Sequence, residues 1–565
     1  MQRILILFLI IYYWSATDLM GQNFYLKIQD ESAESTIIID SINYFKKHAD
    51  FNSLSNEIDS LKTKIYSLGY IDAKWQPVEK LNDSVFQTNV IIGKPYKYIN
   101  IYFNLDSLPS NALKQLQVNS SKTFFTVRFR EIEQTLQFIN RKISEQGLPF
   151  SSLKLAHIEK EENLTLRADL VISGEEKTRY IDKILVKGYD KFPKSYLKYY
   201  LKLKPEKALN LEYVKQQTNL LQELPFANQL KEPEILFSKD STILYVYIEK
   251  TKSNSFDGFL GFGTNEETSK LELTGYLNLE LTNNLNFGES ISLAYRSDES
   301  EQKSFNVNVK LPYLFTSPFG AELELNIFKK DSSFTTADQS VRVNYQLNSK
   351  NQFSLGLKST KSSNLLSSEN LNPFIKDYET NFYNIGYTFI NRLKGQTIFK
   401  RNATIRFNTG IGNREISNTK DQQYQYNLDA FKIFSLNSKN NIFLRTTSIG
   451  LFSDSYLENE LSRFGGINSI RGFEENSLSA TFYGLLITEY RYSLSSNLYI
   501  HTIIDAAYFE NKIIDQKEKL YSFGFGFGLT TKSGLLRFNY ANGKSENQSF
   551  KLSNSKIHLS LTALF

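Results

Sequence analysis

Residues 519–531, KLYSFGFGFGLTT, carry the pattern that decides the fold of this chain. Phe523, Phe525 and Phe527 stand at every second position and are separated by glycines. Because successive side chains of a β-strand point to opposite faces, this spacing predicts a strand with one strongly apolar face. The last residues, 555–565, alternate in the same way and end in Phe565, which predicts a final strand of the same kind.

Alternating segments of this kind fill the chain from Phe256 onward. Sixteen can be counted, at 256–263, 270–282, 289–298, 303–315, 319–330, 337–347, 351–360, 377–392, 397–412, 422–436, 440–453, 478–494, 497–510, 519–531, 534–544 and 555–565. An even number of alternating antiparallel strands is typical of single-chain bacterial membrane barrels. We therefore expect residues 256–565 to form an all-β, 16-stranded antiparallel transmembrane barrel.

The connections between these segments differ in length. Those after even-numbered segments are mostly tight, as at 316–318, 348–350, 437–439, 495–496 and 532–533. Those after odd-numbered segments are mostly longer, as at 361–376, 413–421, 454–477 and 545–554. Transmembrane barrels have short periplasmic turns and long extracellular loops, so both ends of this barrel are expected on the periplasmic side. Phe565 would then be an interface anchor and a sorting mark for barrel insertion.

The residues ahead of the barrel carry one pattern three times, at 22–95, 96–177 and 178–255. Each copy has an amphipathic helix, a break and two strands. The helical faces are Leu54, Ile58, Leu61, Ile65 and Leu68, then Ile132, Leu136, Ile139 and Ile143, then Leu211, Val214 and Leu221. The order β-α-α-β-β predicts α+β units with a small sheet and two helices on one face. Such units usually bind polypeptide through exposed sheet edges.

The N-terminus has the features of an export signal. Arg3 supplies a positive charge, and an apolar stretch of about a dozen residues follows from Ile4 to Trp14. Small residues come next, so cleavage is expected after Gly21, which makes 1–21 a signal peptide. A retained anchor is the alternative, but the apolar stretch is short for one.

The composition excludes several classes of protein. With no Cys among 565 residues, the chain has no disulfide, thiolate metal site, cysteine nucleophile or lipid-modified N-terminal Cys. The net charge of +6 is modest, and basic residues alternate with acidic ones, so no nucleic-acid partner is expected. Aromatic residues make up 14%, which suits the outer face and interface girdles of a barrel.

Four stretches of the chain resemble a known family. They are FGGINSIRGF at 464–473, TEYRY at 488–492, IDAA at 504–507, and GFGFGL at 524–529 with SGLLRF at 533–538. The first is similar to the (V/I)RG(F/Y) motif in the sixth extracellular loop of the BamA/TamA superfamily of outer-membrane assembly and translocation barrels. Ala507 departs from the family, which usually has glycine there. The three repeats resemble POTRA (polypeptide-transport-associated) domains, and the barrel resembles the bacterial surface antigen type.

The resemblance implies that this loop folds back into the barrel lumen. There the guanidinium of Arg471 would meet Glu489 and Asp505, which lie on adjacent segments joined by a tight turn. Arginine suits this role because its planar fork can bond two acceptors at once. A sharp turn at Gly472 and packing of Phe473 inside the barrel complete the arrangement. The full lumen contact would comprise Ile470, Arg471, Gly472, Phe473, Glu489 and Asp505. The alternative is that Arg471 is a solvent-exposed loop charge.

Histidine chemistry is the remaining possibility for catalysis. His501 stands four residues before Asp505, so both side chains point to one side of a strand. Acid–base chemistry is conceivable there, but a hydrogen bond in the lumen is the expected role. The sequence has no paired serine-nucleophile motif and no metal-ligand spacing such as HxxxH. No catalytic residue, metal or cofactor is therefore expected.

These features together predict an outer-membrane assembly, insertion or translocation factor of a Gram-negative bacterium, with its repeats in the periplasm. The repeats would bind unfolded outer-membrane or secreted clients by strand addition, and the barrel would insert them at a lateral seam between its first and last strands. Gly258, Gly261 and Gly263 weaken the first strand, and Phe565 ends the last. Outer-membrane lipids and accessory proteins of the periplasm or inner membrane are further expected partners.

Two other functions stay open. A two-partner secretion pore, which exports one dedicated protein, usually has two POTRA domains and a plug helix, for which only 29–50 offers room here. An outer-membrane enzyme or a passive channel fits less well, since an enzyme would show a Ser/His/acid set and a porin would lack the repeats and the RGF motif. Three repeats rather than five favour the accessory, TamA-like branch over the essential assembly barrel.

Overall fold

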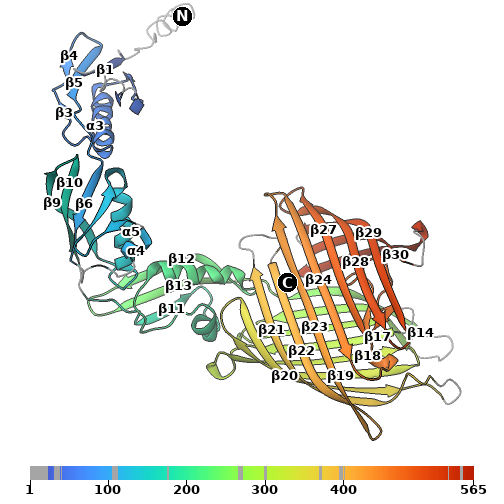
Figure 1. The fold of residues 1–565 in the computed structure, drawn as a ribbon. Helices are drawn as coiled ribbons and strands as arrows, with labels where there is room; N and C mark the ends of the chain where they lie inside the picture. Colours follow the sequence, from blue (N-terminus) through green and yellow to red (C-terminus); the bar gives the residue numbers. More distant parts are fainter. Residues whose placement is uncertain are drawn as a thin grey trace, which may run out of the picture. The chain divides into compact units, whose positions relative to one another are not determined.

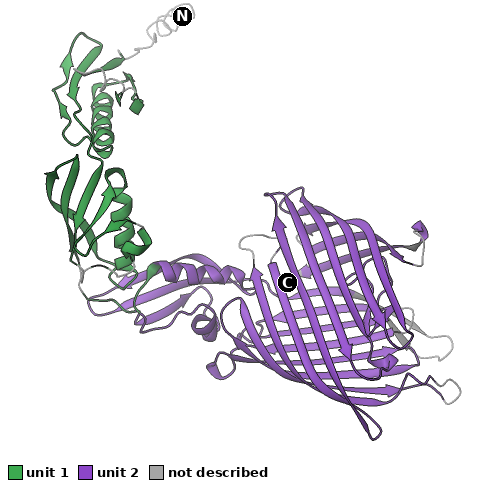
Figure 2. Ribbon diagram, viewed as in Figure 1, with its two compact units in different colours: residues 1–180, 208–211 green, residues 181–207, 212–565 purple. Residues whose placement is uncertain are grey.

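The computed structural model describes residues 23–564 with several short gaps. The gaps are 31–37, 40, 105–107, 109–111, 117, 175–176, 265–270, 298–301, 368–371, 393–398, 400, 532–533 and 547–550. The expected signal peptide, 1–21, lies outside the described residues. The chain forms two compact units, one of residues 1–180 with 208–211 and the other of residues 181–207 with 212–565 (Figure 2). None of the described helices is long and apolar enough to cross a membrane.

The first repeat packs one long helix on a small sheet. The sheet is built on the parallel pair β1 (Phe24–Asp30) and β5 (Val85–Ile91). Its short outer strands are β2 (Lys47–His48), β3 (Lys74–Trp75) and β4 (Glu79–Lys80). Helix α3 (Phe51–Ser67) is capped by Asp50, which accepts a hydrogen bond from the backbone N–H of Ser53 at 2.7 Å. The helix buries Leu54, Ile58, Leu61 and Ile65, the face that their spacing predicts.

The second repeat has a five-stranded sheet of order β7-β8-β6-β10-β9. Its strands are β6 (Tyr98–Tyr102), β7 (Asn119–Ser120), β8 (Phe124–Arg128), β9 (Ser152–Glu161) and β10 (Thr165–Ser173). Helices α4 (Ala112–Leu116) and α5 (Ile132–Ser144) accompany it, and Ile139 and Ile143 of α5 pack against the sheet. The β7–β8 hairpin is additional to the β-α-α-β-β order that the sequence predicts.

The third repeat belongs to the same compact unit as the barrel. Its sheet has the order β11-β13-β12, from β11 (Lys183–Lys187), β12 (Ala227–Phe237) and β13 (Thr242–Lys250). The helical segments are a π-helical turn (Tyr196–Tyr200), α6 (Leu211–Thr218) and a 3-10 turn (Asn219–Glu223). Val214 and Leu221 are buried as expected. Leu211, which was expected on the same buried face, is 44% exposed, because it is the first residue of its helix and lies before the residues that the helix buries.

Sixteen antiparallel strands close into a barrel (Figure 1). They are β14 (Ser255–Thr264), β15 (Leu271–Thr282), β16 (Ser290–Ser297), β17 (Gln302–Leu311), β18 (Phe319–Lys330), β19 (Phe334–Gln346), β20 (Asn351–Asn364), β21 (Tyr378–Arg392), β22 (Arg401–Ile416), β23 (Thr419–Ser435), β24 (Asn440–Phe452), β27 (Phe482–Ser493), β28 (Leu498–Asn511), β29 (Gln516–Thr531), β30 (Gly534–Ser545) and β31 (Ser555–Leu564). The expected fold class, α+β repeats followed by an antiparallel barrel, is confirmed.

Some strands extend further than the sequence predicts. The loop predicted at 413–421 is wrong, because β22 and β23 continue until only 417–418 remain between them. Arg414 is buried and forms an ion pair with Asp421 on the paired strand at 2.5 Å. These charged residues suggested a loop in the sequence, but they belong to the two strands. Other connections after odd-numbered strands are tight as well, at 331–333 and 512–515, and the long ones are 365–377, 453–481 and 546–554.

Candidate functional site in the barrel lumen

The connection 453–481, between β24 and β27, forms the centre of the candidate site. It contains a 3-10 turn (Glu458–Glu460) and the paired short strands β25 (Ser462–Phe464) and β26 (Leu478–Ala480). Phe464 and Ile470 are buried in one apolar cluster with side chains of β27, β28 and β29. Those side chains are Tyr483, Leu485, Ile487, Ala507, Phe509 and Leu520. The connection is therefore packed onto the barrel wall and is not a free surface loop.

Arg471 is 4% exposed and makes four hydrogen bonds to two carboxylates. Its Nε and Nη2 donate to Oδ2 and Oδ1 of Asp505 at 2.8 and 2.6 Å, and its backbone N–H donates to Oδ2 at 3.2 Å. Its Nη1 donates to Oε1 of Glu489 at 2.5 Å. The structure thus brings together the three charged residues that the sequence singled out, and Arg471 is not a solvent-exposed charge.

A second arginine, which the sequence analysis did not single out, completes the group. Nε of Arg491 donates to Oε2 of Glu489 at 2.7 Å, and the Arg491 guanidinium lies 3.9 Å from the centroid of the Phe443 ring. Two guanidinium groups therefore meet two carboxylates. This balance matters because Glu489 and Asp505 are both buried, and a buried carboxylate without a cation is costly. Arg491 was visible in the TEYRY motif, two residues after Glu489 and so on the same strand face.

Gly472 lets the loop lie directly on strand β30. Its φ is +85°, and a Cβ at this position would lie 2.4 Å from the backbone nitrogen of Gly543. Phe473 packs against the apolar cluster and also covers Gly543, where an added Cβ would lie 2.7 Å from the Phe473 ring. All six residues of the expected lumen contact thus lie in or beside one packed group.

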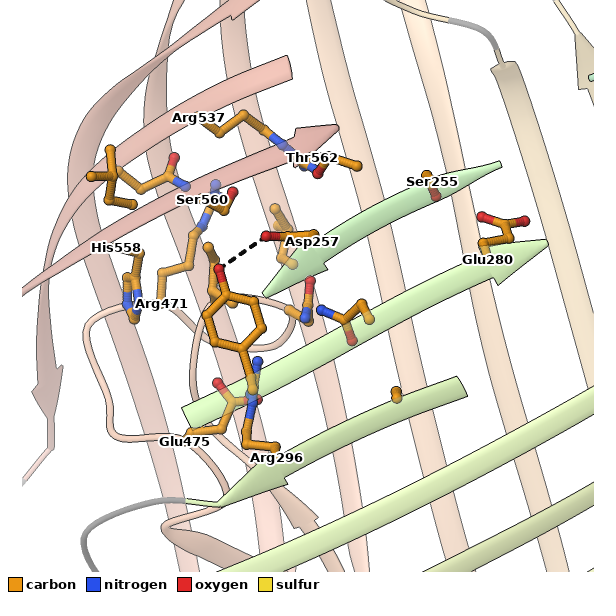
Figure 3. Close-up of a pocket in the computed structure, with 18 of the residues that line it drawn as sticks. Ser255, Asp257, Glu280, Arg296, Arg471, Glu475, Arg537, His558, Ser560 and Thr562 are labelled. Carbon is orange, nitrogen blue, oxygen red and sulfur yellow. Dashed lines mark hydrogen bonds and ion pairs between the residues drawn. The ribbon is translucent and has the colours of Figure 1, made fainter. Parts of the chain in front are cut away.

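A cavity of about 770 Å³ adjoins Arg471, and Figure 3 shows part of its lining. The charged and hydroxyl-bearing ones include Ser255, Asp257, Glu280, Arg296, Glu475, Arg537, His558, Ser560 and Thr562. They come from the first strands of the barrel, from the 453–481 connection and from the last two strands. The cavity therefore lies where the first and last strands meet.

Two acidic residues of the loop bond to opposite sides of that junction. Glu475 pairs with Arg296 on β16 at 2.5 Å. Glu474 pairs with Lys556 on β31 at 2.9 Å. The loop that carries Arg471 is consequently connected to the third and to the last strand of the barrel, one on each side of the junction.

The junction of β14 and β31, here called the seam, has only two residue pairs, Ser255 with Leu564 and Phe256 with Ala563. By contrast, β14 pairs with β15 along all ten of its residues. The facing edges of 257–264 and 555–562 are thus unpaired in the described strands. The predicted seam residues Gly258, Gly261 and Gly263 lie in this unpaired stretch of β14, whereas Phe565 lies outside the described residues.

That these three glycines weaken β14 stays a prediction from the sequence. All three keep their partners on β15, and at Gly258 a Cβ would lie 2.5 Å from the backbone oxygen of Tyr276. In the register of the seam, 257–264 lie opposite 555–562, so the short pairing means that the two strands are not hydrogen-bonded beyond their first two pairs, although their register would allow more.

His501 makes the hydrogen bond in the lumen that the sequence predicts. Its Nε2 lies 2.9 Å from Oδ1 of Asn539, while Asp505 is occupied by Arg471. Within the described ranges, no group of three or more His, Asp or Glu side chains is placed to hold a metal ion.

A second ionic group, around Arg414, was missed by the sequence analysis. The Arg414 side chain is fully buried and donates to Glu460 at 2.6 Å and to Asp421 at 2.5 Å. Glu460 also accepts a hydrogen bond from Gln423 at 3.1 Å. This group fastens the start of the 453–481 connection to β22 and β23. No sequence signal identified it, because Arg414 stood in a predicted loop.

No family model and no curated protein matches the chain. Solved structures do match. CdiB from Acinetobacter baumannii and CdiB from Escherichia coli align with TM-scores of 0.52 and 0.51, each at 14% identity and over 91% of this chain, and cover 98% and 97% of the CdiB chains. BamA from Haemophilus ducreyi lacking POTRA domains 1–3 aligns with a TM-score of 0.50 at 15% identity, over 82% of this chain and 99% of that chain.

The fold and the site together define a 16-stranded barrel that carries α/β repeats and a loop fastened by arginine to its inner wall. Solved structures of BamA and CdiB align with this fold, so the resemblance that the sequence suggested is confirmed for the fold. An alignment over 91% of the chain must also include the repeats, since the barrel begins only at Ser255.

Proposed function

We propose that this chain is a factor of the Gram-negative outer membrane that inserts or translocates other proteins, with its repeats in the periplasm. The repeats bind unfolded clients by strand addition, and the barrel receives the client at the seam. The fold shared with BamA and CdiB supports a role of this general kind. The observation that carries the finer mechanism is the seam itself, where two strands leave most of their facing edges unpaired.

An unpaired strand edge is a template for another strand, and closed barrels normally have none. Here 257–264 and 555–562 keep the backbone groups of their facing edges free of each other. A client strand that pairs with either edge satisfies those groups, and repeated addition of strands extends a nascent barrel beside the seam. The cavity behind the seam is polar, so it admits water and the polar face of an alternating client strand.

The repeats have edges suited to the first capture step. In the second repeat β9 is an outer strand of ten residues, paired only with β10 on its inner side. In the third repeat β12 is likewise an outer strand, with eleven residues. Each is long enough to pair with an extended client segment.

The rival mechanism is export through the lumen, as in a two-partner secretion pore. The packed loop 453–481 must then leave its site, because Arg471 and its apolar neighbours occupy part of the interior. Breaking the buried ion pairs of Arg471 makes that movement costly. Insertion at the seam requires separation of only two residue pairs, so we favour it.

Depletion of the protein from its native cell tests the proposed function. The outer-membrane proteome is measured by quantitative mass spectrometry before and after depletion. The expected result is a loss of several barrel proteins, with their unfolded forms accumulating in the periplasm. Loss of one secreted protein with normal levels of all barrel proteins would assign the chain to dedicated export. A proteome that does not change would contradict both functions.

A further inference from the structure

A second cavity of about 710 Å³ lies at the end of the barrel next to the third repeat. One side is aromatic and includes Tyr196, Tyr200 and Phe226 of the repeat and Tyr313 of the β17–β18 connection. The rest is lined by strands of the barrel. The repeat is fixed against the barrel here, because the Tyr196 hydroxyl donates to the backbone oxygen of Gly288 at 3.2 Å and its ring packs edge-on against Tyr313 at 4.9 Å. We call this space the mouth cavity.

The mouth cavity has an excess of positive charge. Its cationic lining residues are Lys310, Arg342, Lys350, Arg392, Arg401, Arg406 and Arg445, and its acidic ones are Glu280, Glu322, Glu324 and Asp429. Seven cations against four acids leave +3. Three of the acids are already engaged, since Glu322 and Glu324 bond Arg342 and Asp429 bonds Arg445 and Arg406.

Arg392 and Arg401 stand directly opposite each other on β21 and β22. Like charges at facing positions of a sheet destabilise it. Neither guanidinium has an ion pair within the described residues, and the connecting residues 393–400, LKGQTIFK, contain no acidic side chain. The pairing thus places two positive charges side by side on the cavity wall, where an anion would be attracted to both.

We propose that the mouth cavity binds a carboxylate-bearing segment of the client polypeptide, with Arg392 and Arg401 holding its acidic side chains. This proposal rests on the proposed function and names the partner chemistry of its entry step. An arginine pair can bond carboxylates through several donors at once, and the aromatic side accepts the apolar residues of the same segment. A polypeptide fits better than a lipid, because the lining belongs to the barrel interior and the third repeat and not to the lipid-facing wall.

The test is a direct binding measurement on the purified full chain in nanodiscs of zwitterionic lipid. The probe is a rhodamine-labelled peptide of alternating Leu and Glu, compared by fluorescence anisotropy with a peptide of the same length in which Gln replaces Glu. Binding of the Glu peptide is expected to be about tenfold tighter, and the difference is expected to shrink as salt rises. Equal binding of the two peptides would overturn the proposal.

The double variant Arg392→Gln, Arg401→Gln is expected to lose the preference for the Glu peptide. The matched control is Lys361→Gln, Lys420→Gln, which removes the same charge from side chains that are 70% and 66% exposed and do not line the mouth cavity. The control variant must keep the preference for the Glu peptide. Loss of the preference in both variants would mean that it depends on the overall charge of the protein, which would overturn the proposed binding site. If the double variant does not fold, the two single variants are measured instead.

Two further measurements distinguish a peptide site from a structural arginine pair and from a lipid site. Without peptide, the arginine variants are expected to be at least as heat-stable as the parent, since they remove a like-charge pair; a large loss of stability would assign the arginines a structural role instead. Added phosphatidylglycerol must leave the peptide preference unchanged, and its loss would assign the site to lipid phosphate. Because the assay reads binding and not assembly, its result is independent of whether the seam opens.

Discussion

Arg471 and Asp505 meet through two parallel hydrogen bonds, from Nε at 2.8 Å and from Nη2 at 2.6 Å, in a barrel whose seam has two residue pairs. This two-point contact fixes both the position and the orientation of the loop guanidinium. The same loop bonds β16 through Glu475 and β31 through Glu474. A loop held by several ion pairs therefore lies beside a seam that has few residue pairs.

Replacing Arg471 by Ala is expected to leave the protein exported but with a less stable or less active barrel. The change leaves Asp505 buried with no cation, and breaking a buried pair in this way costs about 3–5 kcal/mol. Heat-modifiability on gels and complementation of a depleted strain measure the effect. Arg471→Lys is the matched control. Its stability and activity are expected to lie between those of the parent and those of Arg471→Ala, because lysine keeps the positive charge but lacks the planar guanidinium that forms two parallel hydrogen bonds. Parental behaviour of Arg471→Ala in both assays would contradict the role given to this contact.

The Arg414 group is expected to matter for stability as much as the Arg471 group does. Arg414→Gln leaves Glu460 buried with no cation, so a loss of about 3–5 kcal/mol is again expected. Adding Glu460→Gln to this variant is expected to restore part of the loss, because the unpaired charge disappears. Denaturant unfolding of the three proteins in detergent gives the comparison. A double variant no more stable than Arg414→Gln alone would show that the buried charge is not the cause.

The two acidic residues of the loop, Glu474 and Glu475, are expected to help keep the seam closed. Replacing both Glu474 and Glu475 by Gln removes the bonds to Lys556 and Arg296 without changing any residue of the strands. The seam is then expected to open more often, which hydrogen–deuterium exchange detects as faster exchange in 255–264 and 555–564. Exchange in β21 and β22 serves as the internal reference. Unchanged rates at the seam would mean that these ion pairs contribute nothing there.

The contact between Asp72 and Lys160, in the two repeats of the first unit, gives a pH prediction. The hydrogen bond from Lys160 lowers the pKa of Asp72 below its usual 3.8, and the bond to Asp72 raises the pKa of Lys160. For a lowered carboxyl pKa, the stabilisation is present above 3.8 and is lost as the pH falls through the lowered value. The contact is therefore expected to persist throughout the neutral range. In Lys160→Gln the Asp72 pKa is expected to rise, as an NMR titration would record, and an unchanged pKa would contradict the contact.

Phe565 remains a prediction from the sequence. Deleting it is expected to leave material in the periplasm, while the fraction that does insert works normally. Cell fractionation measures the distribution of the truncated chain. Normal outer-membrane levels would contradict a role of this residue in insertion.

The sequence predicted those features that depend on local periodicity. Alternation along each strand indicated sixteen strands, and the helical stripe through Leu54, Ile58 and Leu61 indicated the buried face of α3. The Arg471 contact was also foreseeable, because the RGF motif marks the loop and the turn after β27 sets Glu489 and Asp505 on neighbouring strands.

Features that depend on long-range register could not be predicted in this way. Arg414 looks like a loop charge in the sequence, since its burial depends on Glu460, 46 residues away in the chain. The seam joins the first strand of the barrel to the last, so the number of residue pairs between β14 and β31 depends on how the whole barrel closes and is not visible in the sequence of either strand. The facing of Arg392 and Arg401 likewise requires a bulge between Asn391 and Arg392 that no periodicity reveals.

The most direct test of the central claim is to lock the seam. The chain has no Cys, so Phe256→Cys with Ala563→Cys introduces one unambiguous pair at directly facing positions. The Cα atoms of facing residues in antiparallel strands lie about 4.5–5.5 Å apart, a distance that a disulfide can span. Leu279→Cys with Leu293→Cys, on strands β15 and β16, which share eight residue pairs, is the matched control. Assembly of client barrels is measured under oxidising and reducing conditions. The account predicts that the seam disulfide blocks assembly, that reduction restores it, and that the control disulfide has no effect. A verified seam crosslink that leaves assembly unchanged would contradict insertion at the seam and favour transport through the lumen.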